Sequence, residues 1–285
     1  MKQLLILSGK GGTGKTTIAS SFIQLSQARA YADCDVEAPN LHLINSLGEK
    51  TSKPYYGMKK AKIDQSKCIK CGLCQTHCRF DAIDFDGTYK INPYMCEGCS
   101  VCQFVCPVDA IEMYDSIDGE TTIYRGKQLF STAELNIGSG NSGKLVTEVK
   151  ENLKSNLTDE EFVIIDGSPG IGCPVIASLS GVDMVLIVAE PTLSGLSDLQ
   201  RIIETAKHFR VKIAVCVNKY NINESLTRKI KKHVEGLKIA FVGEIPYDKN
   251  VVKLINRGKT PIDENSEVSF AIKRVYENAI AILNA

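Results

Sequence analysis

The stretch that decides the fold of this chain is GKGGTGKT, residues 9–16. It fits the pattern G-x4-G-K-[ST], in which glycines let backbone N–H groups close around phosphate oxygens. Such a loop needs a strand before it and a helix after it, and the neighbouring sequence predicts both. Residues 3–8 are a Leu- and Ile-rich run typical of a central parallel strand, and apolar Ile18, Phe22 and Leu25 then recur at helical spacing.

The pattern of this loop implies roles for Lys15 and Thr16. Lys15 is expected to reach the β- and γ-phosphates of ATP or ADP, and Thr16 to offer its hydroxyl to Mg²⁺. The alternative is a Gly-rich strand-to-helix turn that binds no ligand. The further nucleotide contacts are expected from Gly11, Gly12, Thr13, Gly14 and Thr17.

Strand and helix patterns alternate again in the second half of the chain. This alternation predicts an α/β fold, with a mostly parallel P-loop sheet covered by helices on both faces. Strands are expected at 162–166, 184–189, 211–217 and 239–242, and helices at 196–209, 224–235 and 266–283.

The composition narrows the class of protein. The chain has 285 residues, a net charge of +1 and 44% hydrophobic residues, which is typical of a globular protein. We expect neither nucleic-acid binding nor membrane insertion, because the net charge is near zero and no apolar stretch approaches the roughly 20 residues that span a bilayer. The 11 cysteines without a secretory signal favour metal ligation in a reducing compartment, so a cytoplasmic location is expected.

Eight of the cysteines form two copies of the spacing C-x2-C-x2-C-x3-C, 28 residues apart. This spacing is typical of bacterial ferredoxins with two [4Fe-4S] clusters, in which the fourth Cys of each run ligates the other cluster. Zinc is the alternative, although zinc sites usually pair two separated C-x2-C units. The rule predicts one cluster on Cys68, Cys71, Cys74 and Cys106, and the other on Cys96, Cys99, Cys102 and Cys78.

The cysteine-rich block interrupts the α/β pattern. We therefore expect a small α+β ferredoxin-type domain at 58–120, inserted into an ATPase domain made of 1–57 and 121–285. The insert is an internal repeat, because Ile63-Asp64 precedes the first cysteine run at the offset at which Ile91-Asn92 precedes the second. Halves of about 28 residues are too small to fold alone, so metal is expected to supply the missing core.

With Lys10 as a second lysine, the loop resembles that of the deviant-Walker-A ATPases, which include MinD, ParA, the Mrp-type cluster carriers and the nitrogenase iron protein. The resemblance implies that Lys10 crosses a dimer interface to the partner's nucleotide. It also implies that Asp35 in switch I orients the attacking water, so that Lys10, Lys15, Asp35 and Asp166 form the catalytic set. The alternative for Asp35 is a helix cap or a turn acid.

Three further residues take their roles from the same resemblance. Asp166, which opens Asp166-Gly167-Ser168-Pro169-Gly170, is implied to join Thr16 on the Mg²⁺ shell. Asn218 is implied to read adenine, with a turn residue as the alternative, and Pro246 lies where a loop covers the base.

The combination of P-loop and cysteine runs resembles the MinD-superfamily ATPases with an inserted ferredoxin domain. It implies a homodimer, or a heterodimer with a paralogue, in which ATP state is coupled to electron transfer through two [4Fe-4S] clusters to an unknown redox or cluster-acceptor protein. The alternatives are an ATP-dependent iron-sulfur or metallocluster carrier, and a positioning or regulatory ATPase like MinD or ParA.

Four positions stay open at this point. Arg79 follows Cys78 where a proline is usual, and it either raises the potential of that cluster, docks an acidic partner or is a tolerated substitution. Cys34 and Cys216 are expected in the core. Cys173 is expected to pack behind Pro174, with a cluster or redox role as the alternative.

Overall fold

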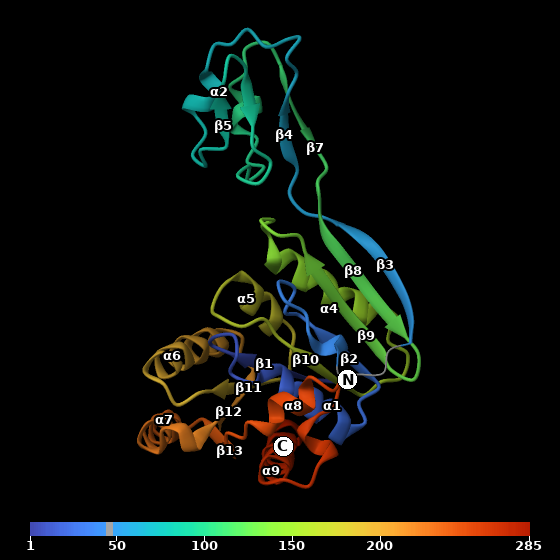
Figure 1. Ribbon diagram of the computed structural model, residues 1–285, viewed down its shortest axis with the longest axis vertical. Coiled ribbons are helices and arrows are strands. Elements are labelled where there is room, and N and C mark those ends of the chain that lie inside the picture. Colours follow the sequence, from blue (N-terminus) through green and yellow to red (C-terminus); the bar gives the residue numbers. More distant parts are fainter. Residues whose placement is uncertain (44–47) are drawn as a thin grey trace. The chain divides into compact units, whose positions relative to one another are not determined.

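The computed structural model describes residues 1–43 and 48–285 (Figure 1). The described chain divides into two compact units. The first comprises 1–52, 121–134 and 142–285, and the second comprises 53–120 with 135–141. An insert at 58–120 stays a prediction, and the second unit also takes in the short segment 135–141.

The first unit contains most of a largely parallel sheet. The described strands of this sheet are β1 (Lys2–Ser8), β2 (Ala30–Asp33), β3 (Glu49–Tyr56), β8 (Ile117–Arg125), β9 (Leu129–Leu135), β10 (Phe162–Asp166), β11 (Met184–Ala189), β12 (Lys212–Asn218) and β13 (Ala240–Ile245). Their order is β13-β12-β11-β1-β10-β2-β9-β8-β3. All neighbours from β13 to β9 pair in parallel. The predicted α/β class with a mostly parallel sheet is therefore confirmed.

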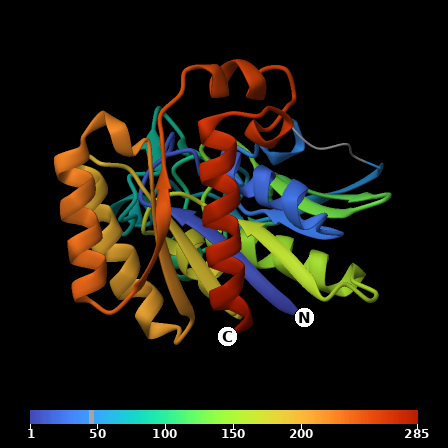
Figure 2. The same cartoon turned by 90° about the horizontal axis from the view of Figure 1, so that it is seen from below.

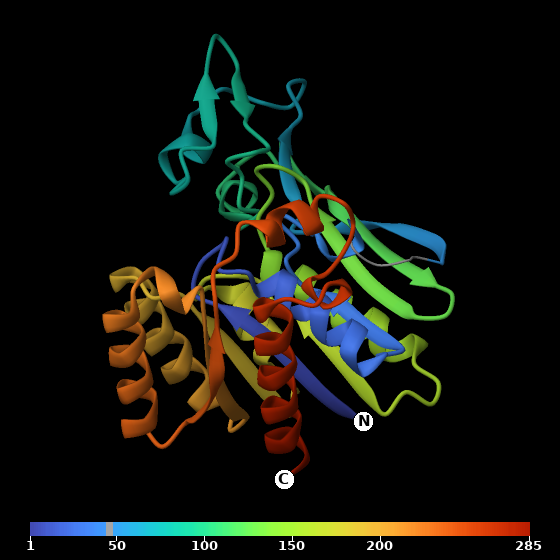
Figure 3. The ribbon, with the colours of Figure 1, turned by 60° about the horizontal axis from the view of Figure 1, so that its bottom comes forward.

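Helices cover this sheet. They are α1 (Lys15–Ser26), α4 (Ser142–Asn156), α5 (Cys173–Leu179), α6 (Leu193–His208), α7 (Glu224–Gly236), α8 (Asn250–Ile255) and α9 (Glu267–Asn284). Helices α1 and α9 share one core with alternate strand residues such as Leu4, Ile6 and Leu186, and Figure 2 shows α9 lying across the strands. Figure 3 shows α6 and α7 side by side at the β11–β13 end.

The predicted elements are found, with small shifts at their ends. Strands β10 and β11 have the predicted bounds. Every residue of β11 is buried, and a strand covered on both faces has a continuous apolar run that marks both of its ends. Helix α6 begins earlier than its apolar stripe indicates, because the Thr192 side chain accepts a hydrogen bond from the Gly195 N–H at 2.9 Å and caps it. Strand β3 was not predicted, since EKTSKPYY has almost no apolar pattern and lies at the sheet edge.

The second unit is built as a 28-residue repeat. Strands β4 (Lys60–Ile63) and β7 (Ile111–Tyr114) pair antiparallel, as do β5 (Ile83–Phe85) and β6 (Tyr89–Ile91), and the short helices are α2 (Leu73–Thr76) and α3 (Val101–Phe104). The Asp64 N–H donates to Ala110 O at 2.7 Å, and the Asn92 N–H donates to Ala82 O at 2.8 Å. These two bonds are equivalent under the repeat, so the start of each half is fastened to the end of the other.

No helix in the described ranges is both long enough and apolar enough to cross a membrane.

Candidate functional site

The P-loop lies between β1 and α1, and its backbone allows a close approach. Gly14 precedes α1 with φ 93°, a conformation that residues with a Cβ rarely adopt. A Cβ there would collide with Nδ2 of Asn218, which donates to the Thr13 carbonyl at 2.6 Å. Asn218 at the end of β12 thus braces the loop through its side chain.

Two carboxylates meet Lys15 at the carboxyl ends of β2 and β10. The Lys15 Nζ lies 2.6 Å from Asp166 Oδ1 and 3.8 Å from Asp35 Oδ2. Lys15 is 5% exposed and Asp166 is fully buried. The second carboxylate oxygen of Asp166, Oδ2, is buried without a hydrogen-bond partner, and such an atom marks a place where a further polar group fits. The structure therefore brings Lys15, Asp35 and Asp166 together, while Thr16 follows in the first turn of α1.

Asp33 belongs to the acidic stretch Asp33-Cys34-Asp35, and the sequence alone assigned a role only to Asp35. Asp33 is fully buried; its Oδ1 accepts the Asp35 N–H, and its Oδ2 accepts the N–H groups of Asn40 and Leu41, each at 3.0 Å. One carboxylate thereby fixes the backbone of the segment that presents Asp35. The D-x-D spacing after a buried strand was the signal that could have identified it.

Burial and mutual repulsion shift the pKa values of these acids. Burial, together with repulsion from the negative charge of Asp166, raises the pKa of Asp33 to about 7. Burial raises the pKa of Asp35 to about 6, although Lys15 opposes the shift. Burial lowers the pKa of Lys15, but Asp166, Asp33 and Asp35 together outweigh it, so the net shift is upward. Lys15 therefore stays charged, and the group binds protons more tightly than free carboxylates do.

The Lys10 side chain is 37% exposed, and its ammonium is paired within the chain. Its Nζ lies 3.0 Å from Glu190 Oε2 and 3.5 Å from Thr192 Oγ1. The other oxygen of Glu190 lies 3.0 Å from the Lys219 Nζ, which also donates to the Gly12 carbonyl at 2.8 Å. Burial raises the pKa of Glu190, but the hydrogen bonds from Lys219 and Lys10 outweigh it and hold that pKa below its ordinary value. Glu190 therefore links Lys10 to Lys219 and, through Lys219, to the Gly12 carbonyl. The sequence did not predict this link.

A cavity of about 370 Å³ adjoins the P-loop. Its polar edge includes Gly12, Gly14, Thr17 and Asn218, and Pro246 lies on the loop after β13. Its apolar wall is made of Ile18, Ile245, Val251, Val252, Val268 and Ile272. A flat apolar ring beside a phosphate-binding loop fits such a cavity.

The eight cysteines of the repeat line two separate cavities in the second unit. Each cavity has a volume of about 20 Å³. What we call the first cavity is lined by Cys68, Cys71, Cys74 and Cys106, and the second cavity by Cys78, Cys96, Cys99 and Cys102. Each cavity thus takes three thiols from one run and the fourth from the other run. Within residues 1–43 and 48–285, no three His, Cys, Asp or Glu side chains converge closely enough to hold a single metal ion.

The remaining cysteines divide into two kinds. Cys34 and Cys216 are fully buried, and burial raises the pKa of each thiol to about 12, so the predicted core role is confirmed. Cys173 is exposed at the start of α5. The expectation that it packs behind Pro174 is therefore wrong, because the residue is exposed.

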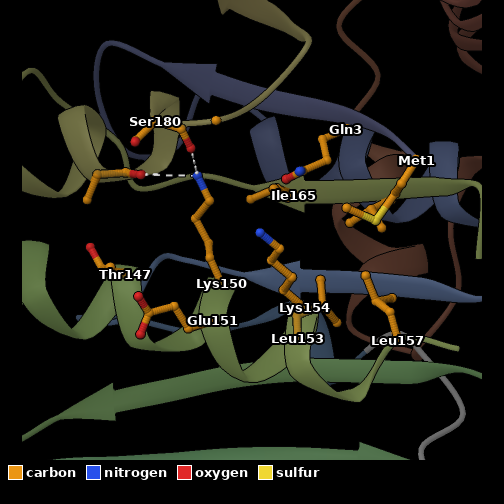
Figure 4. A pocket seen from close by; sticks show the side chains of 13 residues that line it. Met1, Gln3, Thr147, Lys150, Glu151, Leu153, Lys154, Leu157, Ile165 and Ser180 are labelled. Atoms are coloured by element: carbon orange, nitrogen blue, oxygen red, sulfur yellow. Dashed lines mark hydrogen bonds between the residues drawn. The ribbon is translucent and has the colours of Figure 1, made fainter.

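A further cavity of about 270 Å³ lies between α4, α5 and the starts of β1 and β10 (Figure 4). The Lys150 ammonium there donates to the carbonyls of Ala177 and Ser178 at 3.1 and 2.8 Å, and also to that of Ser180. Lys150 thereby satisfies the free carbonyls at the end of α5, so its role is structural. None of the predicted site residues lines this cavity.

The fold and the loop geometry define a P-loop nucleotide-binding protein. The family model of the CobQ/CobB/MinD/ParA nucleotide binding domain matches residues 4–262, and the chain belongs to this family. The uncharacterized protein MJ0578 of Methanocaldococcus jannaschii is 38% identical, over 96% of this chain and 95% of its own length.

Solved structures share the fold. The septum site-determining protein MinD from Pyrococcus horikoshii, complexed with Mg-ADP, matches with a TM-score of 0.57 and 17% identity, over 100% of this chain and 98% of that one. The ATP complex of a McdA variant from Cyanothece matches with a TM-score of 0.58 and 18% identity, over 100% and 96%. At these identities the two structures show a shared fold and no more.

Proposed function

We propose that this protein is a nucleotide-switched dimeric ATPase whose cysteine-rich unit holds two [4Fe-4S] clusters. The observation that carries the iron-sulfur part is the division of eight thiols between two cavities, four in each. The ATPase part is supported by the family and by the arrangement of Lys15, Asp35 and Asp166.

At the nucleotide site, Asp166 and the phosphate oxygens of the nucleotide compete for the Lys15 ammonium. Without a ligand, Lys15 is held by Asp166 at 2.6 Å. Phosphate oxygens would compete with Asp166 for the Lys15 ammonium. Asp166 and Thr16 would then hold a Mg²⁺ ion, which when bound supplies neutralisation of the phosphate charge. Asp35, whose backbone is fixed through Asp33, would orient the attacking water.

Lys10 connects this chemistry to assembly. To reach the nucleotide of a partner subunit it must leave Glu190, from which it is 3.0 Å away. Dimerisation therefore exchanges an internal ion pair for contacts to phosphate, which favours the dimer only while ATP is bound. The partner is a second copy of this chain or a paralogue.

The four thiols in each cavity are the donor set that a cubane cluster takes. The walls of the cavities are apolar, with Ile63 and Ile111 at the first and Ala61 and Ile83 at the second, and apolar surroundings protect a cluster from water. The Ala110 N–H donates to Cys106 Sγ at 3.3 Å, and amide donors to sulfur stabilise thiolate ligands. Thiols spread around a cavity suit a polynuclear cluster better than a single Zn²⁺ ion, whose four ligands converge on one point. When bound, the two clusters supply one-electron transfer.

A second candidate function is favoured by the comparisons. In this view the chain is a regulatory or positioning ATPase of the MinD/ParA type, and the cysteine-rich unit serves a structural or sensing role. The packed helix α9, which buries Val268, Ile272, Val275 and Leu283, does not offer the free amphipathic face of a membrane-binding segment. The carrier alternative requires labile ligation, whereas here each set of four thiols is complete.

Anaerobic reconstitution tests the proposal. With iron and sulfide the chain should bind about eight iron atoms, four for each cluster. Cys102→Ser should lose about half of them, while Cys173→Ser should lose none. ATPase rate and cluster reduction are then measured on the same samples. No iron uptake would refute the iron-sulfur part, and a nucleotide that changes the oligomeric state but not the reduction of the clusters would favour the regulatory ATPase.

A further inference from the structure

Lys60 is a buried lysine in the second unit that no motif accounts for. Its side chain is 7% exposed, and its Nζ donates to the carbonyl of Cys96 at 2.7 Å. No carboxylate of the described residues forms an ion pair with it. A buried charge without a counter-charge is strongly destabilising, so this ammonium requires an anionic neighbour.

The surroundings of Lys60 identify that neighbour. The following residue, Ala61, lines the second cavity, and Cys96 is one of its four thiols. The preceding carbonyl, that of Lys59, lies so close to Gly98 that a Cβ there would collide with it. The start of β4 therefore packs directly on the loop from Cys96 to Gly98.

The 28-residue repeat makes the two cavities comparable, and Lys60 breaks their equivalence. The residue at the matching position in the other half is Thr88, which is neutral. Lys62, two residues further along β4, is exposed. The second cavity thus has a buried positive charge at its cysteine loop, whereas the residue at the matching position for the first cavity is neutral.

We propose that Lys60 is a positioning and charge-compensating residue for a [4Fe-4S] cluster in the second cavity, and that it makes this cluster the more easily reduced of the two. The proposal rests on the proposed iron-sulfur function. Four thiolates around an oxidised cubane leave a net charge of about −2, and reduction adds one more negative charge. A fixed ammonium stabilises the reduced form more than the oxidised form, which raises the potential.

Other charges near the two cavities have smaller effects. Lys67 and Lys70 beside the first cavity and Glu97 and Arg79 beside the second are all exposed, so solvent and salt screen them. The amide that donates to Cys106 Sγ favours the first cluster, but it contributes a dipole and not a full charge. The buried ammonium is therefore the dominant difference. A single electron given to the unit leaves the first cluster oxidised and the second reduced, with no proton transferred.

The test is a potentiometric titration of the reconstituted full chain with dithionite, followed by EPR. In Lys60→Met the second cluster should become harder to reduce by about tenfold in its reduction equilibrium, which is about 59 mV for one electron. Lys60→Arg keeps the charge and should titrate like the unmodified chain. Lys62→Met removes an exposed lysine of the same strand and should also change nothing.

Single-cluster variants assign the shift and keep the test independent of the folding of Lys60→Met. Cys71→Ala leaves the second cluster, and Cys99→Ala leaves the first. The cluster that remains in Cys71→Ala should have the higher potential, and equal or reversed potentials would overturn the inference. A shift in Lys60→Met that also occurs with Lys62→Met would overturn it as well. Failure of the unmodified chain to take up iron would instead refute the proposed function.

Discussion

Replacing Gly14 by Ala tests whether Asn218 braces the P-loop. Gly14 has φ 93°, and an Ala Cβ would collide with Nδ2 of Asn218. A left-handed conformation costs an Ala about 1–2 kcal/mol. The displaced amide also loses its 2.6 Å hydrogen bond to the Thr13 carbonyl, which contributes about 0.5–1.5 kcal/mol. Together these effects predict a loss of about 1.5–3.5 kcal/mol.

The loss divides between folding and nucleotide binding. If the strained loop keeps its shape, the free energy of unfolding falls; if the loop relaxes, the affinity for ATP falls instead. Urea denaturation and calorimetric titration with Mg-ATP measure the two parts. Their sum should reach the predicted total, which corresponds to roughly 10- to 400-fold when it appears entirely in the dissociation constant.

A double-mutant cycle isolates the collision. In an Asn218→Ala background the side chain that meets the new Cβ is gone, so Gly14→Ala should cost only the conformational strain, about 1–2 kcal/mol. The coupling between the two positions should then be about 0.5–1.5 kcal/mol. An equal cost of Gly14→Ala in both backgrounds would show that Asn218 does not brace the loop.

Three further predictions concern the charged groups of the nucleotide site. Asp166→Ala removes the closer of the two carboxylates paired with the buried Lys15 ammonium and leaves Asp35 at 3.8 Å. It should lower the free energy of unfolding by about 1.5–3 kcal/mol in urea, the usual contribution of a hydrogen bond to a charged group, whereas a loss below about 1 kcal/mol would contradict a buried ion pair. Lys10→Ala should keep ATP affinity but abolish ATP-dependent dimers in light scattering, and Glu190→Gln should form them at lower ATP concentration; unchanged dimers in both variants would exclude the exchange of partners. Because the pKa of Asp33 is raised to about 7 in the folded state, folding takes up a proton between about pH 4 and 7, so Asp33 lowers stability as the pH rises through that window. Asp33→Asn should therefore become more stable relative to the unmodified chain from pH 5 to pH 8 in urea denaturation, and parallel profiles would contradict the shift.

Much of the fold was predictable from local pattern. A continuous apolar run such as Met184–Ala189 marks a strand buried on both faces, and the strand found there has the same bounds. The polar edge strand Glu49–Tyr56 was not predictable, because its hydrogen bonds come from a neighbouring strand and not from its own side chains. The exposure of Cys173 at the start of α5 was not predictable either, because it depends on how the chain around it folds.

The sequence by itself determined the P-loop, the α/β class and the two cysteine runs, because spacing along the chain encodes each of them. Only the tertiary structure decided which charges are buried and what faces them. Asp33 and Asp35 look alike in sequence, yet one fixes three backbone amides and the other faces Lys15. Lys60 and Lys62 are equally alike, yet only Lys60 lies under a cysteine loop. Burial of a charge depends on segments distant in sequence, so no local pattern reports it.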